Sequence, residues 1–184
     1  MRSLLVTAMF ASAIFSWSAP ARAQGMSRDN FPDRKAVIIE SAQTAVTLSG
    51  FSFSNEFDRS SVRLHTNLSW KNSGQKAITA FEVVIRYFDP FNRPMTEGGR
   101  WLITGHDSAN WTPLAPGEAA NDGLLSFGSS EAFTAVVYLR AVRFDEGTVW
   151  TSNQTEVEKR IRGALPQLKD VGVLDPGPKK PAAP

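Results

Sequence analysis

The sequence has no cysteine and only two histidines among its 184 residues. Without cysteine the chain can form no disulfide, so its stability must come from a buried core. It also lacks the lipidated cysteine that anchors a lipoprotein. Zinc and copper sites need clustered Cys, His, Met or carboxylate ligands, and calcium loops need closely spaced aspartates. Neither pattern occurs in the sequence, so we expect no metal ion and no cofactor.

No apolar run is long enough to span a bilayer comfortably. The longest run, 4–15, follows the positive Arg2 and precedes a small-x-small triplet at 21–23. This layout is typical of a secretory signal peptide, residues 1–23, cleaved after Ala23. We therefore expect an exported protein, periplasmic or extracellular, with no membrane anchor after cleavage. An uncleaved N-terminal anchor is the alternative. The absence of cysteine from an exported chain favours the bacterial cell envelope.

The exported chain also lacks a surplus of charge. Once Arg2 and Arg22 are removed with the signal peptide, 18 Lys and Arg residues face 18 Asp and Glu residues. Proteins bind nucleic acids and anionic membrane surfaces through clustered Lys and Arg. No run of these residues here is longer than a pair, such as the one at 179–180. We therefore expect no nucleic-acid partner.

No set of catalytic residues converges in the sequence. His65 lies between Arg63 and Asn67 on the polar side of an alternating stretch, so we interpret it as a solvated surface residue. The His-Asp-Ser run at 106–108 contains the residue types of a hydrolase triad. Consecutive residues cannot generally form that relay, and no G-x-S-x-G turn surrounds the serine. We predict that the protein is not an enzyme and has no catalytic, cofactor-binding or metal-binding residues.

Short alternating stretches fill residues 36–153. Within Val62–Lys71 apolar residues or threonine alternate with polar ones, which indicates a strand with one buried face. The apolar phase slips at Gly50, which predicts a β-bulge there. Turn signals separate the stretches and no helical period interrupts them, so the pattern predicts an all-β, antiparallel β-sandwich of about eight strands. The expected strands are 36–40, 45–54, 62–71, 77–88, 100–104, 124–127, 133–144 and 148–151.

The segments that flank the predicted sandwich differ from it. Residues 24–35 are polar and predict a flexible leader. A capping box at Thr155 and Glu158, followed by apolar residues four positions apart, predicts a short helix within 154–165. The remaining residues, 166–184, are predicted to form a Pro-rich disordered tail.

Four short motifs follow one another between residues 50 and 150. They are a polar turn after a strand (WKNSG, 70–74), an aromatic before aspartate (IRYFD, 85–89), a Pro-Gly-Glu turn (LAPGE, 114–118) and a final hairpin (FDEGTVW, 144–150). This stretch resembles the FxLYD-type family of small exported bacterial proteins, which are mostly of unknown function. The resemblance implies an immunoglobulin-like β-sandwich that serves as a binding or structural module.

Aromatic side chains give the best candidate for a contact surface. Trp70 and Trp150 are in phase with apolar neighbours, so we expect them in the core. Two other tryptophans border loops, and an aromatic and a basic residue share a further loop, where they are available to a partner. The predicted contact patch consists of Phe91, Arg93, Trp101 and Trp111. The alternative for Trp101 is that it caps the core at an edge strand.

These observations favour an exported, non-enzymatic protein-interaction or structural module of the bacterial cell envelope. Its partner would be an unknown envelope protein or a glycan. The alternative function is a carbohydrate-binding module, in which the loop tryptophans stack on sugar rings.

Overall fold

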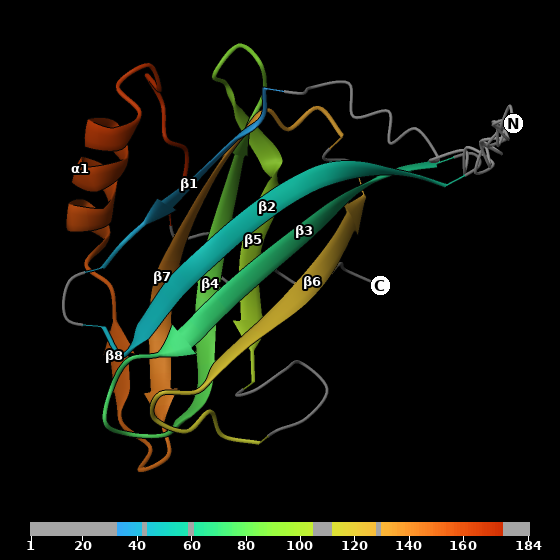
Figure 1. Cartoon of the computed structure of the whole chain (residues 1–184). Helices are drawn as coiled ribbons and strands as arrows, with labels where there is room; N and C mark the ends of the chain where they lie inside the picture. Colours follow the sequence, from blue (N-terminus) through green and yellow to red (C-terminus); the bar gives the residue numbers. More distant parts are fainter. Residues whose placement is uncertain (1–32, 42–43, 59–60, 105–111, 128–129, 175–184) are drawn as a thin grey trace, which may run out of the picture.

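The computed structural model describes residues 33–41, 44–58, 61–104, 112–127 and 130–174, which form two sheets and one helix (Figure 1). The predicted signal peptide lies outside the described residues. The elements are β1 (Lys35–Ile39), β2 (Val46–Asp58), β3 (Ser61–Asn72), β4 (Ile78–Phe88), β5 (Pro94–Ile103), β6 (Ala119–Phe127), β7 (Thr134–Phe144), β8 (Val149–Thr151) and α1 (Gln154–Ala164). The prediction of an all-β sandwich with a short C-terminal helix is confirmed, and its immunoglobulin-like type stays a prediction. None of the described elements is a helix long and apolar enough to cross a membrane.

The two sheets form separate layers (Figure 1). The larger sheet has the strand order β1-β7-β4-β5, with β8 also paired to β7, and the smaller sheet has the order β2-β3-β6. The pair β1–β7 is parallel, with Lys35 opposite Thr134 and Ile39 opposite Tyr138. The prediction of a wholly antiparallel sandwich is therefore wrong at this pair. Alternation within a strand reports which of its faces is buried, but it carries no information on the direction of the neighbouring strand.

The inner faces of the two sheets enclose the main core. The alternation predicted for β3 is confirmed from Leu64 onward, since Leu64, Thr66, Leu68 and Trp70 are fully buried, whereas Val62 at the start of the stretch is exposed. The Trp70 ring meets the Phe81 ring of β4 edge-on, with 5.3 Å between the ring centroids, and so joins the two sheets. The register of β2 against β3 shifts between Leu48 and Gly50, which confirms the predicted bulge.

A second apolar layer covers the outer face of the larger sheet. On this face Val84 and Phe88 of β4 are buried beneath α1 and a C-terminal strap, residues 165–174. The Tyr138 hydroxyl donates a hydrogen bond to the carbonyl of the last strap residue. The buried residues of the strap are Leu165, Leu168, Val171 and Leu174. The prediction of a disordered tail over 166–184 is therefore wrong for 166–174, because an apolar residue at every third position anchors it. Residues 175–184 lie outside the described part of the chain.

The end of the predicted flexible leader is also part of the fold. Lys35 is the first residue of β1, and the Arg34 guanidinium lies 5.3 Å from the centroid of the Phe53 ring and donates to the carbonyl of Ser130 at 3.0 Å. The prediction of a flexible leader is therefore wrong for its last two residues, because the contact between the Arg34 cation and an aromatic face holds the chain as it enters β1.

Helix α1 is capped two residues earlier than the sequence predicted. Asn153 is its N-cap, and its side-chain oxygen accepts hydrogen bonds from the backbone N–H groups of Thr155 and Glu156 at 3.0 and 3.2 Å. The predicted capping box with Thr155 as the cap is therefore wrong, because asparagine is an equally good cap and precedes it. The extent of the helix agrees with the prediction, and Val157 and Ile161 are buried against the sheet as expected.

Candidate functional site

A cleft opens where the edge strand of one sheet faces the edge strand of the other. Strand β5 pairs only with β4 and strand β6 only with β3 within the described ranges, so each leaves one edge unpaired. The cleft between them, the β5–β6 cleft, has a volume of about 210 Å³. Its lining residues are Ile85, Tyr87, Gly98, Gly99, Arg100, Trp101, Leu124 and Ser126.

Two glycines shape the β5 side of this cleft. Gly98 and Gly99 have φ values of +106° and +140°, which residues other than glycine rarely adopt. A Cβ atom on Gly98 would lie 2.6 Å from the carbonyl oxygen of Ile85, so only glycine lets β5 approach β4 so closely. Strand β5 begins at Pro94, a position where an edge strand tolerates proline. The result is a stretch of bare backbone along the cleft.

Trp101 forms a wall of the cleft without being a surface residue. Its side chain is 8% exposed and belongs to the main core, and its backbone is opposite Val83 of β4. Its assignment to an exposed contact patch is therefore wrong. The alternative, that Trp101 caps the core at an edge strand, is the arrangement found, because β5 extends back to Pro94 and places the ring between the sheets.

Two hydroxyl groups add polarity to the mostly apolar cleft. The Tyr87 hydroxyl lies 3.0 Å from the Thr66 hydroxyl, and both residues are buried. Burial raises the pKa of Tyr87, while the hydrogen bond to Thr66 and the charge of Arg34 act against that rise. The Ser126 hydroxyl is buried and has no hydrogen-bond partner among the described residues. A buried polar atom without a partner is costly, so it favours a bound group that supplies one.

The other predicted contact residues lie at the turn between β4 and β5. Phe91 is 76% exposed, and the Arg93 guanidinium lies 5.1 Å from the centroid of its ring. Neither residue lines the cleft that contains Trp101, and Trp111 lies outside the described residues. The structure therefore brings Phe91 and Arg93 together but does not join them to Trp101 in one patch.

Asp89 fixes the conformation of this turn. Its carboxylate accepts hydrogen bonds from the backbone N–H groups of Phe91 and Arg93 at 2.8 and 2.9 Å, and from the Arg93 side chain at 2.6 Å. Desolvation acts to raise the pKa of Asp89, but these hydrogen bonds and the Arg93 charge outweigh it and hold the pKa below its ordinary value of 3.8. Asp89 therefore bonds to the backbone of its own turn.

Replacing Asp89 by asparagine should lower the free energy of unfolding at pH 7 by about 1 kcal/mol, since a charge-assisted set of hydrogen bonds is lost. A carboxylate whose pKa is lowered by folding stabilises the protein above its unfolded pKa of about 4, and this contribution is lost as the pH falls through the folded pKa. The difference between wild type and Asp89→Asn should therefore shrink below pH 4 in urea unfolding. Asp33→Asn, at an exposed carboxylate before β1, is the control. A difference independent of pH would contradict this account.

The sequence offered two candidates for a catalytic role, His65 and the His-Asp-Ser run at 106–108. His65 is partly exposed on the outer face of β3. No group of three His, Asp or Glu side chains within the described ranges is placed to hold a metal ion. The His-Asp-Ser run at 106–108 lies outside these ranges.

Sequence reasoning missed the other residues of the β5–β6 cleft. Tyr87, Leu124 and Ser126 were expected only as members of strands. The signal that could have revealed the cleft is the glycine pair at 98–99, since glycine inside a strand marks a close approach of backbones.

Comparison with known proteins gives little further information. No family model matches the chain, and no curated protein matches it. A solved structure of a hypothetical protein from Peptoclostridium difficile 630 is similar at 13% identity and a TM-score of 0.46, covering 65% of this chain and 91% of that one. The structural genomics target SoR45 is similar at 8% identity and a TM-score of 0.36, covering 59% of this chain and 80% of that one. The FxLYD-type resemblance stays a prediction.

Proposed function

We propose that this chain is an exported, non-enzymatic interaction module of the bacterial cell envelope that binds an extended segment of a partner protein at the β5–β6 cleft. The observation that carries the proposal is a mostly apolar cleft flanked by two strand edges that no described strand pairs with. An unpaired edge offers backbone N–H and C=O groups to an added strand, and an adjacent pocket selects its side chains.

The walls of the cleft define the side chain that it would accept. Trp101 and Leu124 present apolar surface on opposite sides, and the glycine pair leaves the backbone of β5 accessible between them. A volume of about 210 Å³ suits one large aliphatic or aromatic side chain. The unpartnered Ser126 hydroxyl adds one polar contact. The partner segment is therefore expected to carry a bulky apolar residue.

The alternative of a carbohydrate-binding module receives less support. Sugar rings stack on aromatic faces that are open to solvent, whereas Trp101 is 8% exposed. That alternative now depends on Trp111, which lies outside the described residues. Protein recognition needs only the strand edges and the cleft, so it is the function that we propose.

The test compares lysine substitutions at two neighbouring leucines of β6. Leu124 lines the cleft, while Leu125 is 46% exposed and next to it in a strand whose side chains alternate between faces. In cross-linked pull-downs from envelope extract, Leu124→Lys should reduce capture of the partner at least tenfold, because it places a charge in the apolar cleft. Leu125→Lys should capture it as well as wild type does.

Both variants must first show the wild-type circular dichroism spectrum. If the two substitutions reduce capture equally, or if neither does, the β5–β6 cleft is not the binding site. If only glycans are retained on the wild-type protein, the carbohydrate alternative replaces the proposal.

A further inference from the structure

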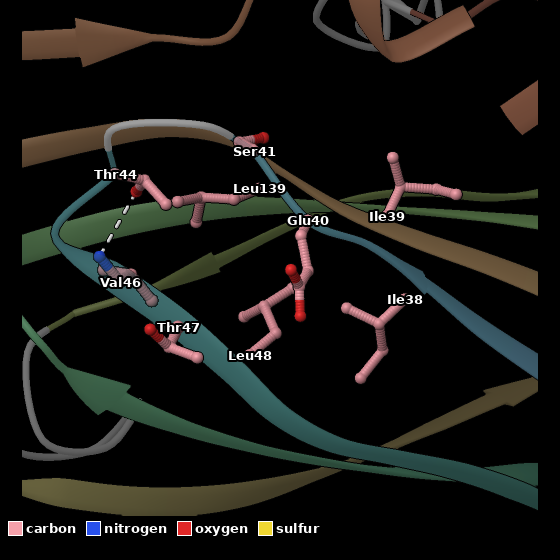
Figure 2. Close-up of a pocket in the computed structure, with 9 residues that line it drawn as sticks. All are labelled: Ile38, Ile39, Glu40, Ser41, Thr44, Val46, Thr47, Leu48 and Leu139. Carbon is pink, nitrogen blue, oxygen red and sulfur yellow. Dashed lines mark hydrogen bonds between the residues drawn. The ribbon is translucent and has the colours of Figure 1, made fainter. Parts of the chain in front are cut away.

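A second cleft lies on the opposite side of the sandwich, where β1 ends and β2 begins. This β1–β2 cleft has a volume of about 170 Å³ (Figure 2). Five of its residues are aliphatic and come from both sheets: Ile38, Ile39, Val46, Leu48 and Leu139. The polar residues at its rim are Glu40, Ser41, Thr44 and Thr47. It shares no residue with the β5–β6 cleft, so an inference from it goes beyond the proposed function.

A single carboxylate, that of the solvent-exposed Glu40, lies beside these aliphatic side chains. Figure 2 shows the Glu40 carboxylate directed between the side chains of Ile38 and Leu48. No hydrogen bond or ion pair of this carboxylate is found among the described residues. The neighbouring Arg160 of α1 does not neutralise it. That guanidinium pairs with Glu156 at 3.1 Å and donates to the backbone carbonyl of Glu40 at 3.0 Å.

Three residues with hydroxyl groups also line the cleft. The Thr44 hydroxyl accepts a hydrogen bond from the Val46 backbone at 3.2 Å, and the Thr47 hydroxyl lies 2.7 Å from that of Ser73. The Ser41 hydroxyl is buried without a partner among the described residues. An ammonium group has three N–H donors and no acceptor, so a carboxylate and a free hydroxyl match it.

We propose that the β1–β2 cleft binds a lysine side chain of a partner, with its methylene stem between the aliphatic walls and its ammonium group on the Glu40 carboxylate. Lysine commonly buries its stem along apolar surface while its charged end meets a polar group. A hydrogen bond between two charged groups is roughly twice as strong as a neutral one, so Glu40 gives both affinity and selectivity.

The composition of the cleft discriminates against other ligands. A carboxylate or phosphate would be repelled by Glu40, which has no cation paired with it in the described ranges. A quaternary ammonium is recognised by a cage of aromatic rings, and the described residues that line this cleft include no aromatic one. A neutral alkyl chain would form no ion pair with the carboxylate. What remains is a hydrogen-bonding cation on an unbranched stem, which the primary ammonium of lysine provides.

The experiment is an NMR titration of the ¹⁵N-labelled protein with Nα-acetyl-lysine N-methylamide. Saturable shifts are expected at residues 38–41, 44–48 and 139. The matched ligand is Nα-acetyl-norleucine N-methylamide, which keeps the stem but lacks the ammonium, and it should bind at least tenfold more weakly. Glu40→Gln should weaken binding of the lysine probe at least tenfold, whereas Glu131→Gln, the same change at an exposed turn before β7, should not.

Three results would overturn the proposal: no shifts at the cleft, equal affinity for both probes, or full affinity in Glu40→Gln. Glu40 is exposed, so the variant is expected to keep the wild-type spectrum outside the cleft. Leu124→Lys should bind the lysine probe as wild type does. That control separates failure of this site from failure of the β5–β6 cleft.

Discussion

Trp70→Ala is expected to lower the free energy of unfolding by about 3 to 5 kcal/mol, the largest effect of any single substitution considered for this protein. Trp70 is fully buried on β3 and contacts Phe81 of the opposite sheet edge-on. Its removal would leave a cavity between the two sheets, because the other core side chains keep the sheets apart. The chain has no disulfide to compensate for this loss. Urea unfolding monitored by circular dichroism measures the effect.

The conservative variant Trp70→Phe tests whether the loss of filled volume is the reason for this destabilisation. The indole N–H of Trp70 is buried without a hydrogen-bond partner among the described residues, so its loss removes a group that costs free energy. Phenylalanine also keeps most of the ring contact with Phe81. We therefore expect Trp70→Phe to destabilise the protein far less than Trp70→Ala does. Equal losses would show that the position depends on a specific contact of the indole rather than on filled volume.

The core of the smaller sheet was predictable because one local rule governs it. Strand β3 has one buried and one wet face, so its period of two in the sequence reports its packing directly. The slip at Gly50 is visible for the same reason, since a bulge changes the phase of the apolar residues that follow it.

The larger sheet departs from that rule and was predicted less well. Strand β4 is covered on both faces, by β3 on one side and by α1 and the strap on the other. Val84 and Phe88 are the apolar residues of its second face, but Glu82 and Arg86 alternate with them and give the appearance of a wet surface. The parallel partner β1 is likewise invisible, because only the tertiary fold brings it beside β7.

The candidate sites could be predicted only in part, because a cleft joins segments that are distant in the sequence. Trp101 was predicted as part of an exposed contact patch, but it is buried where the edge strands β5 and β6 face each other. Nothing in the sequence marks Glu40, because a single glutamate at the end of a strand is common. Its place beside the aliphatic side chains of the β1–β2 cleft is created only when β2 packs beside β1 (Figure 2).

Leu168→Ala is expected to lower the free energy of unfolding by about 2 to 4 kcal/mol. Leu168 is the middle anchor of the C-terminal strap and is buried against the outer face of the larger sheet. The strap has no regular secondary structure, so its side-chain contacts must hold it in place. The control is Val173→Ala in the same strap, where the side chain is 66% exposed and the expected change is below about 0.5 kcal/mol.

The comparison of Leu168→Ala with Val173→Ala decides whether the strap unfolds cooperatively with the two sheets. If it folds with the sheets, Leu168→Ala lowers the urea midpoint of the single transition and leaves its slope unchanged. If the strap opens by itself, the midpoint stays constant and only the amides of residues 165–174 exchange faster with solvent. The first outcome is expected, because Val84 and Phe88 would otherwise lose their cover and expose apolar surface on a central strand. A strap that opens alone would make this face of the sheet available to a partner.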